Sequence, residues 1–288
     1  MDRNDRKGAA QSEAGEMQPD TEADEREEAE KRSSPSGTIV YKAILKEGEE
    51  ELERTSSALF WSGVAAGLAM GFSMFAQAIM ISRLPDADWT PLVSALGYST
   101  GYLIVILGRQ QLFSENTLTP ILPLLQRKPN ATFGNVMRLW AIVLASNLIG
   151  AVLISLVAAH THAFEPEVRE AIAHLGEKAM ALDYGTIVLR GIFAGWLIAL
   201  IVWLLPFAES ARLWVIVIIT YLVGIGEFTH VIAGSIDVFT YAAMGQTTWG
   251  EAFVHYTVPA FIGNVIGGLA LVTAVNHGQV TAGKQNVG

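Results

Sequence analysis

The pattern of apolar residues after position 57 predicts six membrane regions. An α-helix crosses a bilayer in about 20 residues, and each region provides a run of that order. The second and fifth regions are interrupted by glycine and polar residues, and each is the middle member of a set of three. The regions are 58–81, 91–107 resumed in 112–125, 136–159, 187–207, 213–243 and 253–275. The pattern therefore predicts an all-α membrane protein with six transmembrane helices and broken second and fifth helices.

The interruption of the fifth region places His230 and Glu227 within a long apolar run. Ionisable groups at that depth are costly, and they are retained mostly where they face a cavity or a partner. Glycines flank the histidine, and glycine permits irregular backbone. A helix broken inside the membrane is tolerated where it is buried in protein or lines a wet cavity. We therefore expect His230 to lie in a solute pathway.

Two asparagines suggest that the two sets of three regions are repeats. Asn147 in the third region and Asn264 in the sixth both begin an N-x-x-G pattern, 117 residues apart. Adding the same offset to Phe113, in the interruption of the second region, gives His230. Three spans separate the copies, so they have opposite orientations, as in many transporters. The two asparagines fit either the pathway lining or, more simply, hydrogen bonds between closely packed helices.

Charge divides the chain into a tail and a membrane part. Residues 1–57 hold 16 of the 28 Asp and Glu residues and 9 of the 19 Lys and Arg residues, so they carry −7 of the net charge of −9. We expect an acidic, largely disordered tail over 1–54, a six-span domain over 55–277 and a short C-terminal tail over 278–288. A solvated tail is the simpler interpretation, and a regulatory docking segment is the alternative.

The remaining composition bears on cofactors, partners and orientation. The chain has no cysteine, and the spacing of its six histidines forms no metal set. We expect no metal, no cofactor and no nucleic-acid partner; the expected partners are the bilayer and a small solute. Positive charge favours the loops after regions two and four, at Arg127, Lys128, Arg138 and Arg212. The positive-inside rule then predicts an inner-membrane protein with both termini in the cytoplasm.

Four short motifs, in order, resemble those of the formate–nitrite transporter family, and the acidic tail and Arg109 suggest its divergent YfdC-like branch. They are Leu112-Phe113-Ser114 with Asn116-Thr117-Leu118, Arg190-Gly191-Ile192 with Trp196-Leu197 and Val202-Trp203, Phe228-Thr229-His230 with Ile232-Ala233, and Gly263-Asn264 with Gly267-Gly268.

The resemblance implies an aquaporin-like fold, a homopentamer with one pore in each protomer, and passage of small monovalent weak-acid anions such as formate or nitrite. His230 would be the central histidine. Ser114 would match the threonine whose hydroxyl bonds that histidine. Leu112 and Phe113 would form an apolar constriction on one break, and Phe228 would add apolar lining on the other.

Departures from the family pattern concern the neighbours of the histidine. Thr229 stands where the family has glutamate, and Gly234 stands where it has asparagine. Glu227 is a candidate replacement for the missing acid. Arg109 is expected to have a pathway role or a pair with Glu115 or Glu227. Arg190 fits either a snorkelling cation or an anion-attracting vestibule.

Three functions remain open at this point. The first is passage of a weak-acid anion that takes up a proton near His230, because a bare anion loses its hydration in an apolar constriction. In a simpler version His230 stays neutral and only hydrogen-bonds the solute or braces the break. The alternatives are a neutral-solute channel and a membrane scaffold with a vestigial pore. An enzyme is not expected, since the spans hold no paired acids.

Overall fold

The computed structural model describes residues 37–126 and 129–276. The predictions for residues 1–36 and 278–288, and the use of Arg127 and Lys128 for orientation, lie outside this part. Regular structure within these ranges is helical. The helices are α2 (Gly37–Glu53), α3 (Ser56–Arg83), α4 (Thr90–Leu107), η1 (Glu115–Thr117), α5 (Ile121–Gln126), α6 (Pro129–His160), α7 (Pro166–Met180), α8 (Tyr184–Leu204), η2 (Leu205–Phe207), η3 (Glu209–Ala211), α9 (Arg212–Ile225), α10 (Ala233–Ala243), α11 (Trp249–Glu251), η4 (Ala252–Thr257) and α12 (Val258–Asn276).

The helices confirm the predicted fold class. Five of the described helices are long and apolar enough to cross a membrane. The fifth predicted region is divided between α9 and α10, which are too short to be counted with them. The second region ends its long helix at Leu107 and resumes only in the six-residue α5. Both expected breaks are therefore present.

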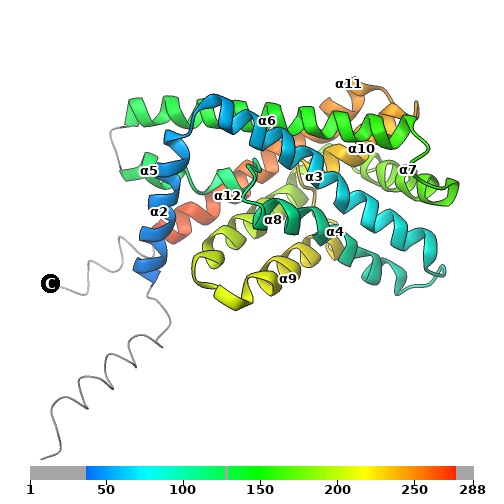
Figure 1. The fold of residues 1–288 in the computed structure, drawn as a ribbon, viewed down its shortest axis with the longest axis horizontal. Helices are drawn as coiled ribbons and strands as arrows, with labels where there is room; N and C mark the ends of the chain where they lie inside the picture. Colours follow the sequence, from blue (N-terminus) through cyan, green and yellow to red (C-terminus); the bar gives the residue numbers. More distant parts are fainter. Residues whose placement is uncertain (1–36, 127–128, 277–288) are drawn as a thin grey trace, which may run out of the picture. The chain divides into compact units, whose positions relative to one another are not determined.

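The two halves pack in the same way. α3 lies along α4 and α6, and its counterpart α8 lies along α9 and α12 (Figure 1). Glycines permit the closest contacts. A Cβ added to Gly67 would lie 2.2 Å from the carbonyl oxygen of Asn147, and one added to Gly195 would lie 2.2 Å from that of Asn264. Each half therefore brings its asparagine against the backbone of the half's first helix.

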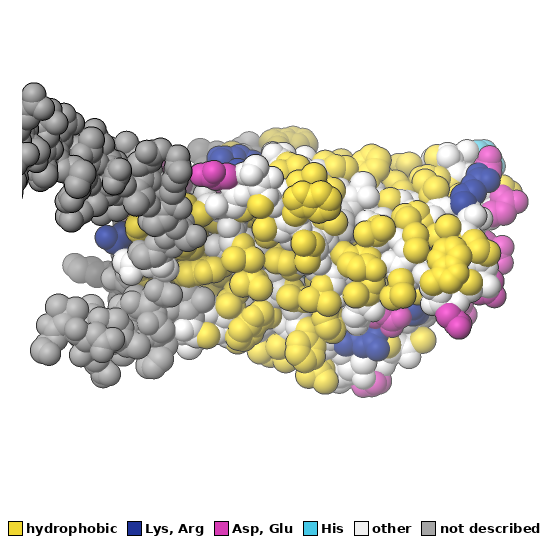
Figure 2. Space-filling model, turned by 90° about the horizontal axis from the view of Figure 1, so that it is seen from below, with side chains coloured by type: hydrophobic (Ala, Val, Ile, Leu, Met, Phe, Trp, Pro, Cys, Tyr) yellow, Lys and Arg dark blue, Asp and Glu magenta, His cyan; other side chains and the backbone are white. Residues whose placement is uncertain are grey.

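The outer surface of the described part is largely apolar. Figure 2 shows an apolar surface over most of one face, with most charged side chains gathered toward the ends of the view. Trp61, Trp214, Ile218 and Val254 are each more than 60% exposed. Such a surface suits contact with lipid or with other apolar protein faces.

Two helices lie outside the predicted spans. α2 belongs to the same compact unit as the spans, which begins at Gly37 rather than at residue 55. It buries Ile44 and Tyr41. α7 lies in the connection between the third and fourth regions, where the pattern of spans predicted no membrane crossing. Its apolar residues Val168, Ala171 and Ile172 recur at helical spacing and are buried.

Candidate functional site

The two breaks begin with the same backbone turn. Gln110 N–H donates to Val105 O and Arg109 N–H to Ile106 O, while Phe228 N–H donates to Val223 O and Glu227 N–H to Gly224 O. Both are Schellman motifs, which end a helix with one left-handed residue. That residue is Arg109 after α4 and Glu227 after α9, each with φ 50°. Glycine usually occupies this position, as Gly245 does after α10.

This equivalence corrects the register of the repeat. Arg109 and Glu227 are 118 residues apart, as are Gln110 and Phe228. The offset of 117 holds for the asparagines but not for the breaks. Leu112, rather than Phe113, is therefore the counterpart of His230.

Asn147 and Asn264 hold the two breaks in place. Asn147 accepts from Phe113 N–H at 2.9 Å and donates to the carbonyl oxygens of Gly63 and Gln111, both at 2.8 Å. Asn147 is fully buried. It therefore satisfies backbone groups that a continuous helix would satisfy internally.

Asn264 repeats the arrangement in the other half. It accepts from Val231 N–H and donates to the carbonyl oxygens of Gly191 and Thr229, each at 2.9 Å. It too is fully buried. Of the two roles considered for these asparagines, the hydrogen-bonding role between helices is the one the contacts show.

His230 joins the two breaks. Its Nε2 lies 2.6 Å from Ser114 Oγ. Its Nδ1 accepts from the backbone N–H groups of Ile232 and Ala233, at 3.2 and 3.1 Å. Because Nδ1 is an acceptor, the proton of the neutral ring is on Nε2, which then donates to Ser114. A second proton on Nδ1 would displace both bonds and face the positive end of α10.

Two cavities approach this hydrogen bond from opposite sides. The first, of about 320 Å³, is bordered by α7 and the α3–α4 loop and reaches Thr229 and His230; we call it the α7 vestibule. The second, of about 610 Å³, is bordered by α2 and reaches Gln111 and Glu115, next to Ser114; we call it the α2 vestibule. The hydrogen bond joins His230, which lines the α7 vestibule, to Ser114, whose neighbour Glu115 lines the α2 vestibule.

Apolar residues close the path between the vestibules. Leu112 and Phe113 have no exposed surface and line neither cavity. The Phe113 ring packs against Trp140 and Phe261, with centroids 5.7 and 5.4 Å away. Phe228 lines the α7 vestibule and packs against Phe193 at 5.3 Å. The site is thus a closed, mostly apolar constriction with one histidine–hydroxyl pair.

Comparison with known proteins now identifies the family. The model of the formate/nitrite transporter family matches residues 38–278. The chain belongs to the formate/nitrite transporter family. It is 33% identical over 267 residues to the inner membrane protein YfdC of Escherichia coli (strain K12), covering 91% of this chain and 86% of that protein.

Solved structures of the formate/nitrite transporter family share the fold. An FNT family ion channel superimposes with a TM-score of 0.72 at 15% identity, covering 85% of this chain and 99% of that one. A pentameric formate channel with formate bound gives a TM-score of 0.65 at 17% identity, covering 76% and 95%. The chain is accordingly a multi-pass membrane protein of a channel and transporter family, and not an enzyme.

The departures from the formate/nitrite transporter motif have structural explanations. Thr229 donates from Oγ1 to Ile187 O at 2.6 Å, so it braces the break against α8. A Cβ on Gly234 would lie 1.9 Å from the hydroxyl oxygen of Tyr256. The Tyr256 phenol thus fills the space next to Gly234, the position where the family has asparagine.

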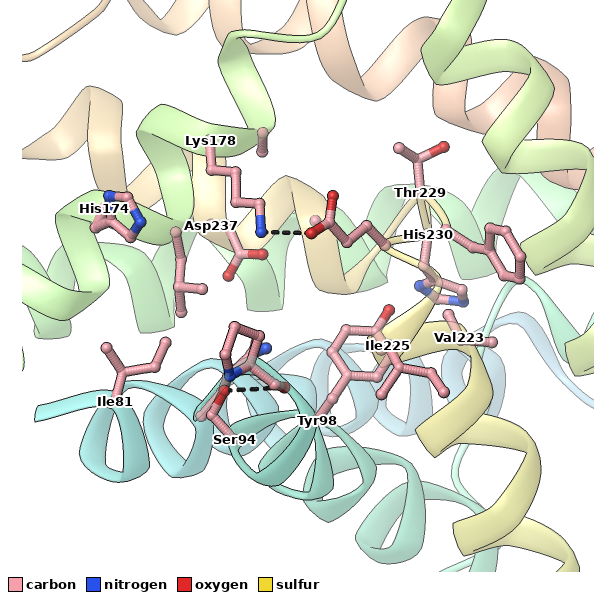
Figure 3. Close-up of a pocket in the computed structure, with 18 of the residues that line it drawn as sticks. Ile81, Ser94, Tyr98, His174, Lys178, Val223, Ile225, Thr229, His230 and Asp237 are labelled. Atoms are coloured by element: carbon pink, nitrogen blue, oxygen red, sulfur yellow. Dashed lines mark hydrogen bonds and ion pairs between the residues drawn. The ribbon is translucent and has the colours of Figure 1, made fainter. Parts of the chain in front are cut away.

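Glu227 does not replace the family glutamate as a partner of His230. Its carboxylate lies 2.5 Å from Lys178 Nζ and 3.1 Å from Arg190 Nη1. The dashed line at Lys178 in Figure 3 marks the first of these ion pairs. Arg190 is therefore paired rather than free at the surface. The α7 vestibule carries two cations bound to one carboxylate.

The α2 vestibule has a different electrostatic character. Arg109 points toward it and forms no ion pair within 4.0 Å in the part of the chain described, so the expected pair with Glu115 or Glu227 is absent. Burial raises the pKa of Glu47, against the opposing effect of Arg109, and burial also raises the pKa of Glu51. Glu51 accepts from Gln111 Nε2 at 2.7 Å, so α2 is bonded directly to the first break.

Sequence reasoning missed three residues that face the α7 vestibule: Asp237, Tyr98 and Tyr256. Tyr98 bonds the hydroxyl of Tyr102 at 2.9 Å, and the Tyr102 ring lies 5.3 Å from that of His230. Asp237 was detectable, because it is an acid seven residues after His230 in an apolar segment. The tyrosines gave no signal, since aromatic residues are common in membrane helices.

Replacing Arg109 with glycine is expected to stabilise the protein by about 0.5–1 kcal/mol. A left-handed non-glycine residue costs about 1–2 kcal/mol, and glycine loses about 0.5–1 kcal/mol in chain entropy. Glu227→Gly should gain less, because it also loses two ion pairs. Thermal unfolding in detergent measures both, with Gly245→Ala as a destabilised control. A lower unfolding temperature for Arg109→Gly would contradict the strain argument.

Proposed function

We propose that this protein passes small monovalent weak-acid anions, such as formate or nitrite, across the membrane together with a proton. The observation that carries the proposal is the closed constriction between two vestibules, with the His230–Ser114 pair at its centre. The family and the formate-bound structural neighbour support the choice of solute.

The constriction favours a neutral solute over an anion. A bare charge between Leu112, Phe113 and Phe228 would lose its hydration without a counter-charge, which is very costly. A protonated weak acid needs only hydrogen bonds. The Nε2–H of His230 and the hydroxyl of Ser114 can supply them as the solute passes.

His230 acts in this proposal as a hydrogen-bond donor and not as the carrier of the proton. Loss of the Nε2 proton from a neutral ring would leave an imidazolate, and a second proton on Nδ1 would displace the bonds from Ile232 and Ala233. The sequence left two roles open for His230, a proton-exchanging group and a neutral hydrogen-bonding group. The geometry favours the neutral group.

We further propose a homopentamer in the inner membrane with both termini in the cytoplasm. Six crossings place the two ends on one side, and the loop charges favour the cytoplasm. The highly exposed Trp61, Trp214 and Val254 provide apolar surface for neighbouring subunits or lipid. The solved pentameric formate channel supports this number of subunits.

The proposed function is tested by uptake of radiolabelled formate and nitrite into proteoliposomes at acid and alkaline pH. We expect uptake above that of empty liposomes, which take up some acid through the lipid, and faster uptake at acid pH. Swelling in urea and glycerol, measured on the same vesicles, tests the neutral-solute alternative. Swelling without formate or nitrite uptake would replace the proposal with that alternative.

A further inference from the structure

Asp237 is a carboxyl group inside the α7 vestibule. It lies on α10, seven residues after His230, which belongs to the break just before that helix. It is the one residue of 231–240 that is not fully buried, and its open surface faces the cavity. Figure 3 shows Asp237 in the same cavity as His230, Tyr98 and Lys178.

No cation neutralises Asp237 among the described residues. Lys178 and Arg190, the nearby cations of α7 and α8, are both held by Glu227. Besides Asp237, the titratable and charged groups that face this cavity are Asp86 from the α3–α4 loop, Tyr98 from α4, His174 and Lys178 from α7, Arg190 from α8, Glu227 and His230 from the second break and Tyr256 from η4. An acid in this position has cavity access and no fixed counter-charge.

Glu115 is the counterpart of Asp237 in the α2 vestibule. It directly follows Ser114 and is the one residue of 111–120 that is not fully buried. Its carboxylate forms no ion pair within 4.0 Å in the described ranges; Arg54 is bound to Glu51. The charged groups facing this cavity are Lys46, Glu47, Glu50 and Glu51 from α2, Arg54 just after it, Arg109 from the first break and Arg212 from α9.

The two carboxyls therefore stand on opposite sides of the same constriction. Asp237 opens to the cavity that ends at His230, and Glu115 opens to the cavity that ends beside Ser114. His230 and Ser114 bond each other at 2.6 Å between them. A solute that moves from one vestibule to the other meets a carboxyl before and after the apolar passage.

We propose that Asp237 and Glu115 are the proton-exchanging groups for the transported weak acid. This inference rests on the proposed function. An anion in the α7 vestibule takes the proton of the Asp237 carboxylic acid: the Asp237 O–H bond breaks, an O–H bond forms on the anion, and Asp237 becomes a carboxylate. The neutral acid then crosses between His230 and Ser114.

The reverse exchange occurs at Glu115. The acid gives its proton to the Glu115 carboxylate and leaves as an anion through the α2 vestibule. Asp237 regains a proton from water in its vestibule, and Glu115 releases its proton to water on the other side. One anion and one proton cross together without net charge, and the same steps run in either direction.

The experiment measures formate entry, internal pH and dependence on membrane potential in proteoliposomes of the full chain. The wild type is expected to carry one proton per formate, with a rate independent of an imposed potassium-diffusion potential. Asp237→Asn and Glu115→Gln are each expected to reduce this flux at least about tenfold; the usual effect of losing an acid–base group is about 100- to 10,000-fold. Asp237→Glu should restore proton-linked flux.

Two matched variants control for charge. Asp88→Asn changes an exposed acid near the α7 vestibule, and Glu53→Gln changes an exposed acid on α2. Neither residue lines a cavity, so both variants should behave as the wild type. If a carboxamide variant does not fold, potential-driven formate entry without a pH change in the wild type would still overturn the inference.

The possible results distinguish a failure of this inference from a failure of the proposed function. Wild-type flux and stoichiometry in both carboxamide variants would overturn the role of the carboxyls alone. Formate entry that follows the membrane potential without a pH change would also overturn the role of the carboxyls, while leaving anion passage in place. A wild type that moves neither formate nor nitrite would overturn the proposed function and this inference together.

Discussion

His230→Phe should reduce acid-stimulated formate flux at least about 100-fold, the usual effect of removing a single preorganised donor from a reacting site. Phenylalanine keeps a ring but loses the Nε2–H directed at Ser114 and the Nδ1 acceptor for Ile232 and Ala233. The solute then has no donor on one side of the constriction. Initial rates of formate entry into proteoliposomes measure the effect.

Paired variants separate the hydrogen bond from the shape of the site. Ser114→Thr keeps the hydroxyl and should retain flux, whereas Ser114→Ala should lose part of it. His160→Asn is the matched control, since His160 is exposed at the end of α6. If His230→Phe kept wild-type flux with an unchanged pH profile, the histidine would not be part of the path.

Asn264→Leu should lower the free energy of unfolding by about 3–5 kcal/mol, which places it among the most damaging substitutions. The leucine side chain is of similar size but leaves Val231 N–H, Gly191 O and Thr229 O without their partner. Each buried polar group left unsatisfied costs about 1–3 kcal/mol. Asn147→Leu should behave alike, because its three bonds hold the other break.

Thermal or denaturant unfolding in detergent checks this expectation. Asn135→Leu is the control, since Asn135 lies exposed on the same helix as Asn147. We expect Asn135→Leu to change stability by less than about 0.5 kcal/mol. Equal stability of Asn264→Leu and the wild type would show that the breaks hold their shape without the asparagines.

Local composition was sufficient for the spans, the breaks and the family. Apolar runs must be helical in a bilayer, because the backbone has no other partner there. The glycines and polar residues near 108–111 and 224–230 therefore predicted interruptions that the structure confirms. The pairing of Ser114 with His230 was expected from the family motif, and the structure contains it.

Other features of the site depend on contacts between segments far apart in the chain. Counting along the sequence could not tell whether the breaks repeat at an offset of 117 or of 118 residues, because the first half has one more residue than the second between its break and its asparagine. The matching turns that end α4 and α9 give 118 for the breaks. The direction of Glu227 followed from its ion pair with Lys178 on α7, a helix between the third and fourth regions.

By itself, the sequence determined that this is a six-span protein with two broken helices and a histidine at the second break, since each of these follows from local composition. Tertiary structure alone decided which groups meet at the breaks. It turned Glu227 away from His230 and set the ring's proton on Nε2. It also placed Asp237 and Glu115 in different vestibules, neither with an ion pair among the residues that the structure describes. Side-chain partners are set by the packing of helices, which no local pattern records.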